Sequence, residues 1–394
     1  MTHTNSFDYV IIGAGLIGLY TALELERLGW RGIILEQRAN PSPSKDSLVT
    51  PRSLATASPR VLAINPATID GLMEVGINEE QLHQQGSDFT GMEVWDREWS
   101  GHLSFDANGL IIENHRLEAL LMARVVERGI PIRWSVQIRD SKVTEDAAWL
   151  DVDSGEQLES ALLVGADGAE SRVRSILGIS TVNRHYEQQA VVAVLRSEVP
   201  HDKVARQWFT ATGPLALLPL DDPNGVVMVW SSSDGEAITI CPPEQLIALL
   251  ARETDRELGT LALVSARATF PLKLQHALQY VKGRAVLIGD AAHSIHPLAG
   301  QGANLGFADA SALGMAISQS MLEPGERLEK PLRAFEQARR RRNLSMTLAT
   351  DGLTQLFADG MPSWLRAARS VGMRVLDQES RLKGWLTDAA SGKL

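Results

Sequence analysis

A glycine-rich turn lies at the start of the chain, between a short apolar run and a helical stretch. The run YVII (9–12) is typical of a buried parallel strand, and GAGLIG (13–18) follows it. LYTALELERLG then has helical spacing, and RGIILEQR gives a second apolar strand that ends in Glu36. Strand, turn, helix and strand, with an acid about 20 residues beyond the glycines, predict a Rossmann-like dinucleotide site.

Each residue type in this motif has a physical reason. Gly13 permits a tight turn, Gly15 lets backbone N–H groups approach a pyrophosphate, and Gly18 lets the helix pack closely on the strand. The helix N-terminus stabilises phosphate charge, and Glu36 can accept hydrogen bonds from a ribose diol. The motif alone does not separate FAD from NAD. The predicted dinucleotide contacts here are Gly13, Gly15, Leu16, Ile17, Gly18, Glu36, Gln37 and Arg38.

Two further stretches combine a buried strand, a turn and a helix. The strand 161–166 runs into Asp167 and Gly168, where Asp167 could serve only as a helix cap. The strand 285–288 ends at Gly289 and Asp290, and open α/β sheets place their ligands at such carboxyl ends. GQGANLG (300–306) then starts a helix whose first N–H groups point back at this turn, so a second part of the same large cofactor is expected there.

These three patterns together resemble those of the single-component FAD monooxygenases built like p-hydroxybenzoate hydroxylase. GAGLIG, VGADGAESRVR and GDAAHSIHPLAGQGANLG occur in that order over nearly the whole chain, and IHPLAGQGANLG with GPLALLPLDD is most similar to the branch that hydroxylates ubiquinone precursors. The resemblance implies bound FAD, with Glu36 on the adenosine ribose and Asp290 on the ribityl chain. Further implied contacts are Asp167 near the pyrophosphate, Arg60 and Arg116 near the cofactor, and Gly289, Pro297, Gly300, Gly302, Ala303 and Asn304 around the flavin.

Some of these residues have simpler interpretations. Arg116 could be an exposed residue of an amphipathic helix, and Arg60 could form a surface ion pair. His293 and His296 are three residues apart, but no cluster of carboxylate or cysteine partners accompanies them. We therefore predict no metal site and treat the histidines as packed or cofactor-adjacent.

The middle of the chain changes to successive strand-like runs with turn signals, one inserted helix after Pro242-Pro243, and a hairpin at 91–105. The expected fold is α/β: a Rossmann-like FAD-binding domain, a discontinuous and mostly antiparallel substrate domain, and a C-terminal helical tail. Aromatic side chains of the second domain should divide between an apolar pocket and the core. The expected boundaries are 1–72, 108–178 and 280–338 for FAD binding, 73–107 and 179–279 for substrate, and 339–394 for the tail.

Composition limits the partners. The net charge of −10 argues against nucleic acid, and the single cysteine allows no internal disulfide. Neither a signal peptide nor a long apolar span is found, so we expect a cytoplasmic protein, with peripheral attachment to the inner face of the membrane as an alternative. The tail begins with four arginines (339–342) and could bind a membrane or a partner, or only cap the fold. A homo-oligomer and contact with a quinone-synthesis complex are further alternatives.

The expected activity follows from the resemblance. NAD(P)H, bound transiently because no second glycine fingerprint is found, would reduce FAD, and dioxygen would supply an oxygen atom to a phenolic ring with a greasy tail. No catalytic acid or base is identified. A flavin oxidoreductase without oxygen insertion, or a non-catalytic FAD-bound scaffold in quinone synthesis, are the alternatives; a WxWxIP-like halogenase stretch is not found.

Overall fold

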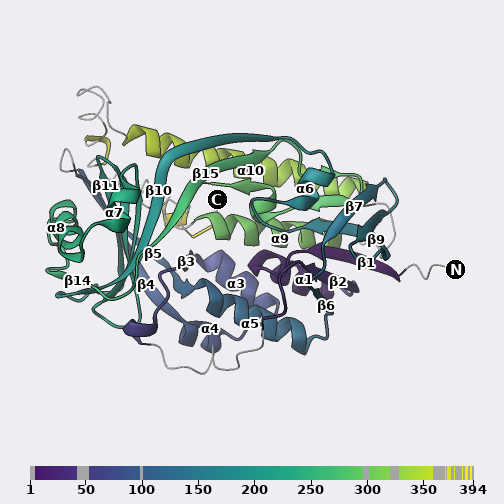
Figure 1. Ribbon diagram of the computed structural model, residues 1–394, viewed down its shortest axis with the longest axis horizontal. Helices are drawn as coiled ribbons and strands as arrows, with labels where there is room; N and C mark the ends of the chain where they lie inside the picture. The colour runs from purple at the N-terminus through teal and green to yellow at the C-terminus, as the bar shows by residue number, and fades with distance from the viewer. Residues whose placement is uncertain are drawn as a thin grey trace.

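Two β-sheets organise the chain in the computed structural model (Figure 1). The first sheet lies at one end of the molecule and the second at the other, and the 17-residue strand β10 (Thr181–Ser197) runs from one end toward the other. The structure describes residues 5–41, 53–97, 101–295, 301–319 and 328–357, together with 369, 371–373, 377, 384, 387–388 and 391–392.

The first sheet is the predicted Rossmann-like unit. Its central strands are parallel and apolar, in the order β16-β17-β9-β1-β2-β6, and β8 with β7 extends from β9. Four helices lie side by side next to it, in the order α5, α1, α9, α10. The strands are β1 (Asn5–Ile12), β2 (Gly32–Glu36), β6 (Ile132–Trp134), β7 (Ile138–Val143), β8 (Ala148–Val152), β9 (Gln157–Gly165), β16 (Val281–Lys282) and β17 (Ala285–Leu287), and the helices are α1 (Leu16–Arg27), α5 (Asn114–Glu127), α9 (Gln301–Gln319) and α10 (Glu329–Leu356).

The second sheet is mostly antiparallel, as predicted, with one parallel contact between β4 and β11. The hairpin expected at 91–105 is the β4–β5 pair. Its strands are β3 (Val61–Ile64), β4 (Gly86–Asp96), β5 (Gly101–Glu113), β10, β11 (Val204–Thr210), β12 (Gly213–Pro219), β13 (Gly225–Ser232), β14 (Leu261–Leu263), β15 (Ala268–Ala277) and β18 (His293–Ser294). The remaining helices are η1 (Leu54–Thr56), α3 (Pro66–Glu74), α4 (Glu79–Gln85), α6 (Arg172–Ile176), α7 (Gly235–Ile240), α8 (Pro243–Glu253) and η2 (Gly289–Ala291).

The two faces of the second sheet differ. Trp208 and Trp230 turn toward α8 and are buried with its Leu246 and Leu250, so these tryptophans belong to the core. Strands β3 and β18 come from stretches assigned by sequence to FAD binding, yet they pair in this sheet. The FAD-binding stretches therefore contribute strands to the second sheet as well as to the first.

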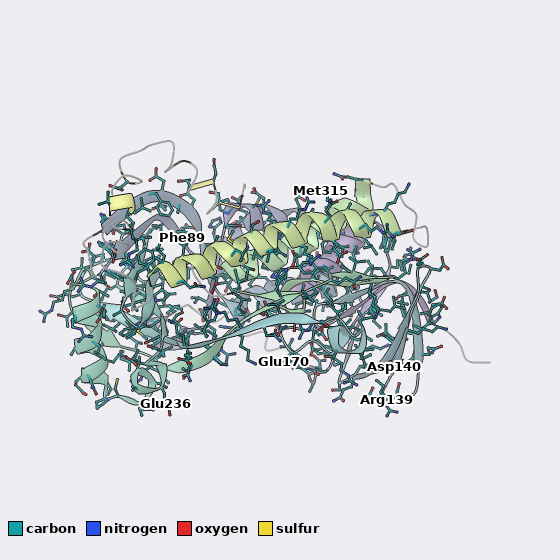
Figure 2. The ribbon with its side chains drawn as sticks, turned by 90° about the horizontal axis from the view of Figure 1, so that it is seen from above. Phe89, Arg139, Asp140, Glu170, Glu236 and Met315 are labelled. Carbon is teal, nitrogen blue, oxygen red and sulfur yellow. The ribbon has the colours of Figure 1, made fainter. Side chains whose placement is uncertain are left out.

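Helix α10 joins the two ends of the molecule, and Figure 2 shows it lying lengthwise along the molecule. At its end, Asp351 accepts hydrogen bonds from Arg184 and Tyr186 of β10. The helix begins ten residues before Arg339, and Arg339 is buried while the next three arginines are exposed. The run of four arginines is therefore not one basic surface. Among the described residues, no helix is both long and apolar enough to cross a bilayer.

Candidate functional site

The three predicted turns lie side by side at one edge of the first sheet. Ile12 pairs with Gly165, and Gly165 pairs with Leu287, so β1, β9 and β17 end at the same level. Across the turns, the Ala166 amide donates to the Ile12 carbonyl at 2.9 Å, and the Ile288 amide donates to the Gly165 carbonyl at 3.1 Å. Carboxyl ends of parallel strands are where open α/β sheets bind ligands.

The glycines of the first turn have different functions. Gly13 has φ +106°, and a Cβ there would lie 2.5 Å from the Ala166 carbonyl oxygen. A Cβ on Gly18 would lie 1.9 Å from the Gly13 carbonyl oxygen. Nothing lies within 4 Å of a Cβ built on Gly15. Gly13 and Gly18 are thus required by the protein's own packing, whereas the space beside Gly15 is open for a ligand.

A cavity of about 520 Å³ opens beside Gly15 and runs between the first and second turns. It brings together most of the predicted dinucleotide contacts from the N-terminal motif and the second motif. The sequence did not point to Val136, Gln137 and Ile138, because they follow β6 with no motif of their own. The lining residues are Ile12, Gly13, Gly15, Leu35, Glu36, Gln37, Arg38, Val136, Gln137, Ile138, Ala166, Asp167, Gly168, Glu170 and Arg172.

Glu36 ends β2 at the floor of this cavity and is firmly held. Its carboxylate accepts hydrogen bonds from the backbone amides of Ala14 at 2.7 Å and Arg38 at 2.8 Å, and the Arg38 guanidinium adds an ion pair. Burial alone would raise the pKa of Glu36, but the hydrogen bonds from Arg38 and Ala14 outweigh it and the pKa is lowered. A fixed anion suits a ribose diol, which donates two hydrogen bonds.

Asp167 performs the capping function that the sequence allowed, and it also lines the cavity. It accepts hydrogen bonds from the Ser171 hydroxyl and from the backbone amides of Arg172 and Val173 at the start of α6. Nearby, Arg174 donates to the Ala291 carbonyl at 2.8 Å and to the Ala169 carbonyl at 2.7 Å. Arg174 therefore ties the second turn to the third.

The third turn packs directly on the first helix. Gly289 has φ +57°, and a Cβ there would lie 3.3 Å from Ile17; one on Gly306 would lie 2.8 Å from the same side chain. The next residue, Asp290, is exposed to solvent, yet the protein atoms crowded around it raise the pKa of its carboxyl by desolvation, while His293 lowers it. Asp290 thus lies at the carboxyl end of β17, with its side chain reaching solvent and protein atoms close around it.

The glycine stretch after this turn begins α9. A Cβ on Gly302 would meet nothing within 4 Å, so the backbone there is open, and Ala303 is half-buried. The Asn304 side chain is occupied: it accepts from the Asn65 amide and the Thr68 hydroxyl and donates to the Ala63 carbonyl. The Asn304 side chain is therefore used within the protein, whereas the backbone at Gly302 has open space beside it. Pro297, Gly300 and His296 lie outside the described residues.

Arg60 and Arg116, the two arginines predicted near the cofactor, lie near β3 and β5 and do not line the 520 Å³ cavity. Arg116 is only 4% exposed; it forms an ion pair with Glu113 at 2.9 Å and donates to Gln85 at 2.7 Å, so the exposed-helix interpretation was wrong. Arg60 is exposed, and its guanidinium lies 4.4 Å from the centre of the Phe270 ring, a cation–π contact.

These features fit one extended dinucleotide. Open space beside Gly15 and the N-terminus of α1 suit a pyrophosphate, and Glu36 suits a ribose. Asp290 follows β17, two strands along the same sheet edge from β1. An isolated NAD motif would need only the first turn. Arg174 ties the turn that carries Asp290 to the second turn, so the candidate site extends across all three turns.

Comparisons with known proteins agree. A family model described as "FAD binding domain" matches residues 6–349. The chain is 32% identical to the ubiquinone biosynthesis monooxygenase COQ6, mitochondrial, of Xenopus tropicalis, over 98% of this chain and 93% of that protein. It is 30% identical to the 3-demethoxyubiquinol 3-hydroxylase of Escherichia coli (strain K12), over 95% of this chain and 96% of that protein.

Among solved structures, p-nitrophenol 4-monooxygenase PnpA from Pseudomonas putida DLL-E4 has a TM-score of 0.77 at 18% identity, with 98% of this chain and 97% of that chain covered. This likeness shows a shared fold. The fold and the site define a flavoprotein with a Rossmann-like domain joined to an antiparallel sheet. The chain belongs to the FAD-binding family that its sequence matches, and it is an FAD-dependent monooxygenase.

Proposed function

We propose that this protein hydroxylates the aromatic ring of a phenolic, polyprenylated quinone precursor, using NAD(P)H and dioxygen. The observation that carries the proposal is the convergence of three far-apart turns at one sheet edge, next to a second sheet with an apolar face. The names of the relatives in ubiquinone biosynthesis support the substrate class.

We assign FAD contacts to the residues selected by sequence. The Gly13–Gly18 backbone would face the pyrophosphate, Glu36 the adenosine ribose, Asp290 the ribityl chain, and the 302–304 backbone the flavin ring. Asp167 would act indirectly, by holding the start of α6 beside the phosphates. When bound and reduced, FAD would supply the dioxygen chemistry, and the protein would hold the ring and exclude water.

An apolar face of the second sheet supports a greasy substrate. Leu54, Val194, Leu220 and Val227 form a buried cluster there, and half-buried Leu218 and Val229 lie at its edge. By strand register, Phe270, which lies under Arg60, belongs to the same face as Val229. We propose that this face contacts the ring and its tail.

The domain division expected from sequence remains part of this proposal, with two adjustments: β3 and β18 would belong to the substrate part, and α10, which contacts α9 and β10, would be shared. A lipid-tailed substrate favours a cytoplasmic protein that works at the inner face of a membrane. Self-association and contact with other quinone-synthesis proteins are part of the same proposal.

Oxygen transfer can be tested directly. The purified yellow protein is given a short-chain prenylphenol, NADH or NADPH, and ¹⁸O₂, and the product is analysed by mass spectrometry. We expect one labelled oxygen on the ring. NAD(P)H-dependent turnover without label would point to an oxidoreductase instead, and no turnover with any phenol despite bound FAD would point to a scaffold.

The assignment of Asp290 is tested by Asp290→Ala. Removing a carboxylate that accepts ribityl hydroxyls should raise the FAD dissociation constant by about tenfold or more, as expected for lost hydrogen bonds to a charged group. Glu236→Ala is the control, because this residue is exposed and far from the cavity. Figure 2 places it at the opposite end of the molecule from Arg139 and Asp140, which directly follow the cavity residue Ile138. Wild-type FAD affinity in Asp290→Ala would contradict the assignment.

A further inference from the structure

A buried polar cluster lies directly behind the third turn. It combines Asp309 of α9, His293 of β18, Arg339 and Asn343 of α10, and Tyr280, which precedes β16. Asp309 and Asn343 are 0% exposed, His293 is 1% exposed and Arg339 is 5% exposed. A charged cluster this deep costs free energy unless every member is paired, so its contacts show what it holds in place.

All the contacts centre on the Asp309 carboxylate. One oxygen, Oδ2, accepts from the Gly289 amide at 3.0 Å and from His293 Nε2 at 2.6 Å. The other, Oδ1, accepts from Arg339 Nε at 2.7 Å and from Asn343 Nδ2 at 3.0 Å. Each oxygen thus accepts two hydrogen bonds, which is the full capacity of its lone pairs.

The charge state of Asp309 follows from these partners. Burial would raise the pKa of Asp309, but His293, Arg339 and Asn343 outweigh it and lower the pKa to about 2. Asp309 is therefore an anion, and an ionised carboxylate is a stronger acceptor for the Gly289 amide than a neutral group would be.

The contact at Gly289 fixes the turn that presents Asp290. Gly289 has φ +57°, which glycine adopts without strain, and Asp290 follows it at once, so an amide held by Asp309 fixes where Asp290 begins. Arg339 also donates to the Leu305 carbonyl at 3.2 Å and to Asn343, so α10 braces the start of α9 as well as Asp309. Since Asp309 is fully buried, it acts on a cofactor indirectly, and its hydrogen bond to the Gly289 amide leads directly to the turn that carries Asp290.

We propose that Asp309, braced by Arg339 of α10, is a positioning residue of the FAD site: it holds the Gly289 amide so that Asp290 faces the cofactor. The proposal rests on the proposed FAD contact of Asp290. The third turn is therefore set by a helix whose far end contacts the second sheet.

The experiment must distinguish a residue that only stabilises the fold from one that positions the FAD site. A second buried aspartate in the same molecule is the matched control. Asp96 of β4 is also fully buried and pairs with Arg369 through two hydrogen bonds, at 2.8 and 2.7 Å. It lies in the second sheet, outside the predicted FAD contacts. Asp96→Asn should lower the melting temperature, as loss of a buried ion pair does, without changing FAD affinity.

The experiment compares Asp309→Asn, Arg339→Gln and Asp96→Asn. FAD is removed, folding of the apoprotein is checked by circular dichroism and melting, and the FAD dissociation constant and the visible flavin spectrum are measured on rebinding. We expect Asp309→Asn to raise the dissociation constant about tenfold or more and to shift the flavin spectrum. Arg339→Gln should act in the same direction more weakly, and Arg339→Lys, which keeps the charge, should recover part of the affinity.

The outcomes separate this proposal from the one it rests on. If Asp290→Ala weakens FAD binding while folded Asp309→Asn and Arg339→Gln bind FAD as the wild type does, positioning by the cluster is wrong and the FAD contact stands. If Asp290→Ala has no effect, the assigned contact itself is wrong. Should Asp309→Asn fail to fold, the Arg339→Gln and Arg339→Lys pair decides.

Discussion

The first and third turns lie at the same sheet edge but are held by different contacts. In the first, the Gly13 amide donates to the Leu35 carbonyl, and Glu36 accepts from Ala14, all within one strand–helix–strand unit. In the third, Gly289 depends on Asp309, and Asp309 depends on Arg339. The first turn is built locally, whereas the third is held by helices that come later in the chain.

Because their contacts differ, the two turns should be sensitive to different substitutions. Backbone packing shapes the first turn, so it should respond most to added atoms. A buried charge cluster shapes the third, so it should respond most to lost charge or to pH. Glycine substitutions test the first turn, and Asp309→Asn, which removes the buried charge, tests the third turn.

The largest effect is expected for Gly18→Ala. The new Cβ would lie 1.9 Å from the Gly13 carbonyl oxygen, a backbone atom, so helix α1 must shift away from the turn. We expect a loss of about 3 kcal/mol in unfolding free energy and of bound FAD. Urea unfolding and the flavin content of the purified protein measure both.

Gly352→Ala is the control for this substitution. It lies within α10 with nothing within 4 Å of a new Cβ, so alanine should be neutral or stabilising by up to about 1 kcal/mol. A Gly18→Ala protein as stable as Gly352→Ala and fully yellow would show that backbone packing does not shape the first turn.

A smaller and more selective effect is expected for Gly15→Ala. Its φ of −82° suits alanine, and nothing of the protein lies near the added methyl group, so apoprotein stability should change by less than about 1 kcal/mol. The methyl group would occupy the space assigned to pyrophosphate, and FAD affinity should fall about tenfold or more. If the apoprotein of this variant binds FAD with unchanged affinity in a titration, the assignment of the pyrophosphate to the space beside Gly15 is wrong.

The smallest effect is expected for His276→Leu, near the third turn. Burial, with His293 and Arg340 adding repulsion and Asp309 opposing them, lowers the pKa of His276 to about 4. The folded protein then binds fewer protons than the unfolded chain, whose histidine pKa is about 6.5, so stability falls as the pH drops below that value.

The wild type should therefore lose roughly 1–2 kcal/mol of unfolding free energy from this residue between pH 7 and pH 5, and His276→Leu should not. Urea unfolding of both proteins at the two pH values measures the difference. Equal pH dependence in the two proteins would place the pH sensitivity elsewhere.

Prediction from sequence succeeded where neighbours in the chain set the geometry. YVII, GAGLIG and Glu36 lie within one unit, and their positions in the structure match the pattern. It failed where distant contacts decide. Arg116 had an exposed interpretation but is buried and donates to Gln85, 31 residues away, and Arg339 was grouped with three exposed arginines although it pairs with Asp309. Asp309 was not selected, although an acid on an apolar helix is the signal that could have found it.

The residues alone were enough to predict the order of strands, turns and helices and the glycines of the first turn, because hydrophobic periodicity and the conformational freedom of glycine act over a few residues. Which side chains are buried as partners, and so which carboxylate holds the third turn, depends on how the whole chain folds. The pairing of buried charges depends on distances between side chains in the folded protein. The separation of Asp309 and Arg339 along the chain does not show that their side chains lie 2.7 Å apart.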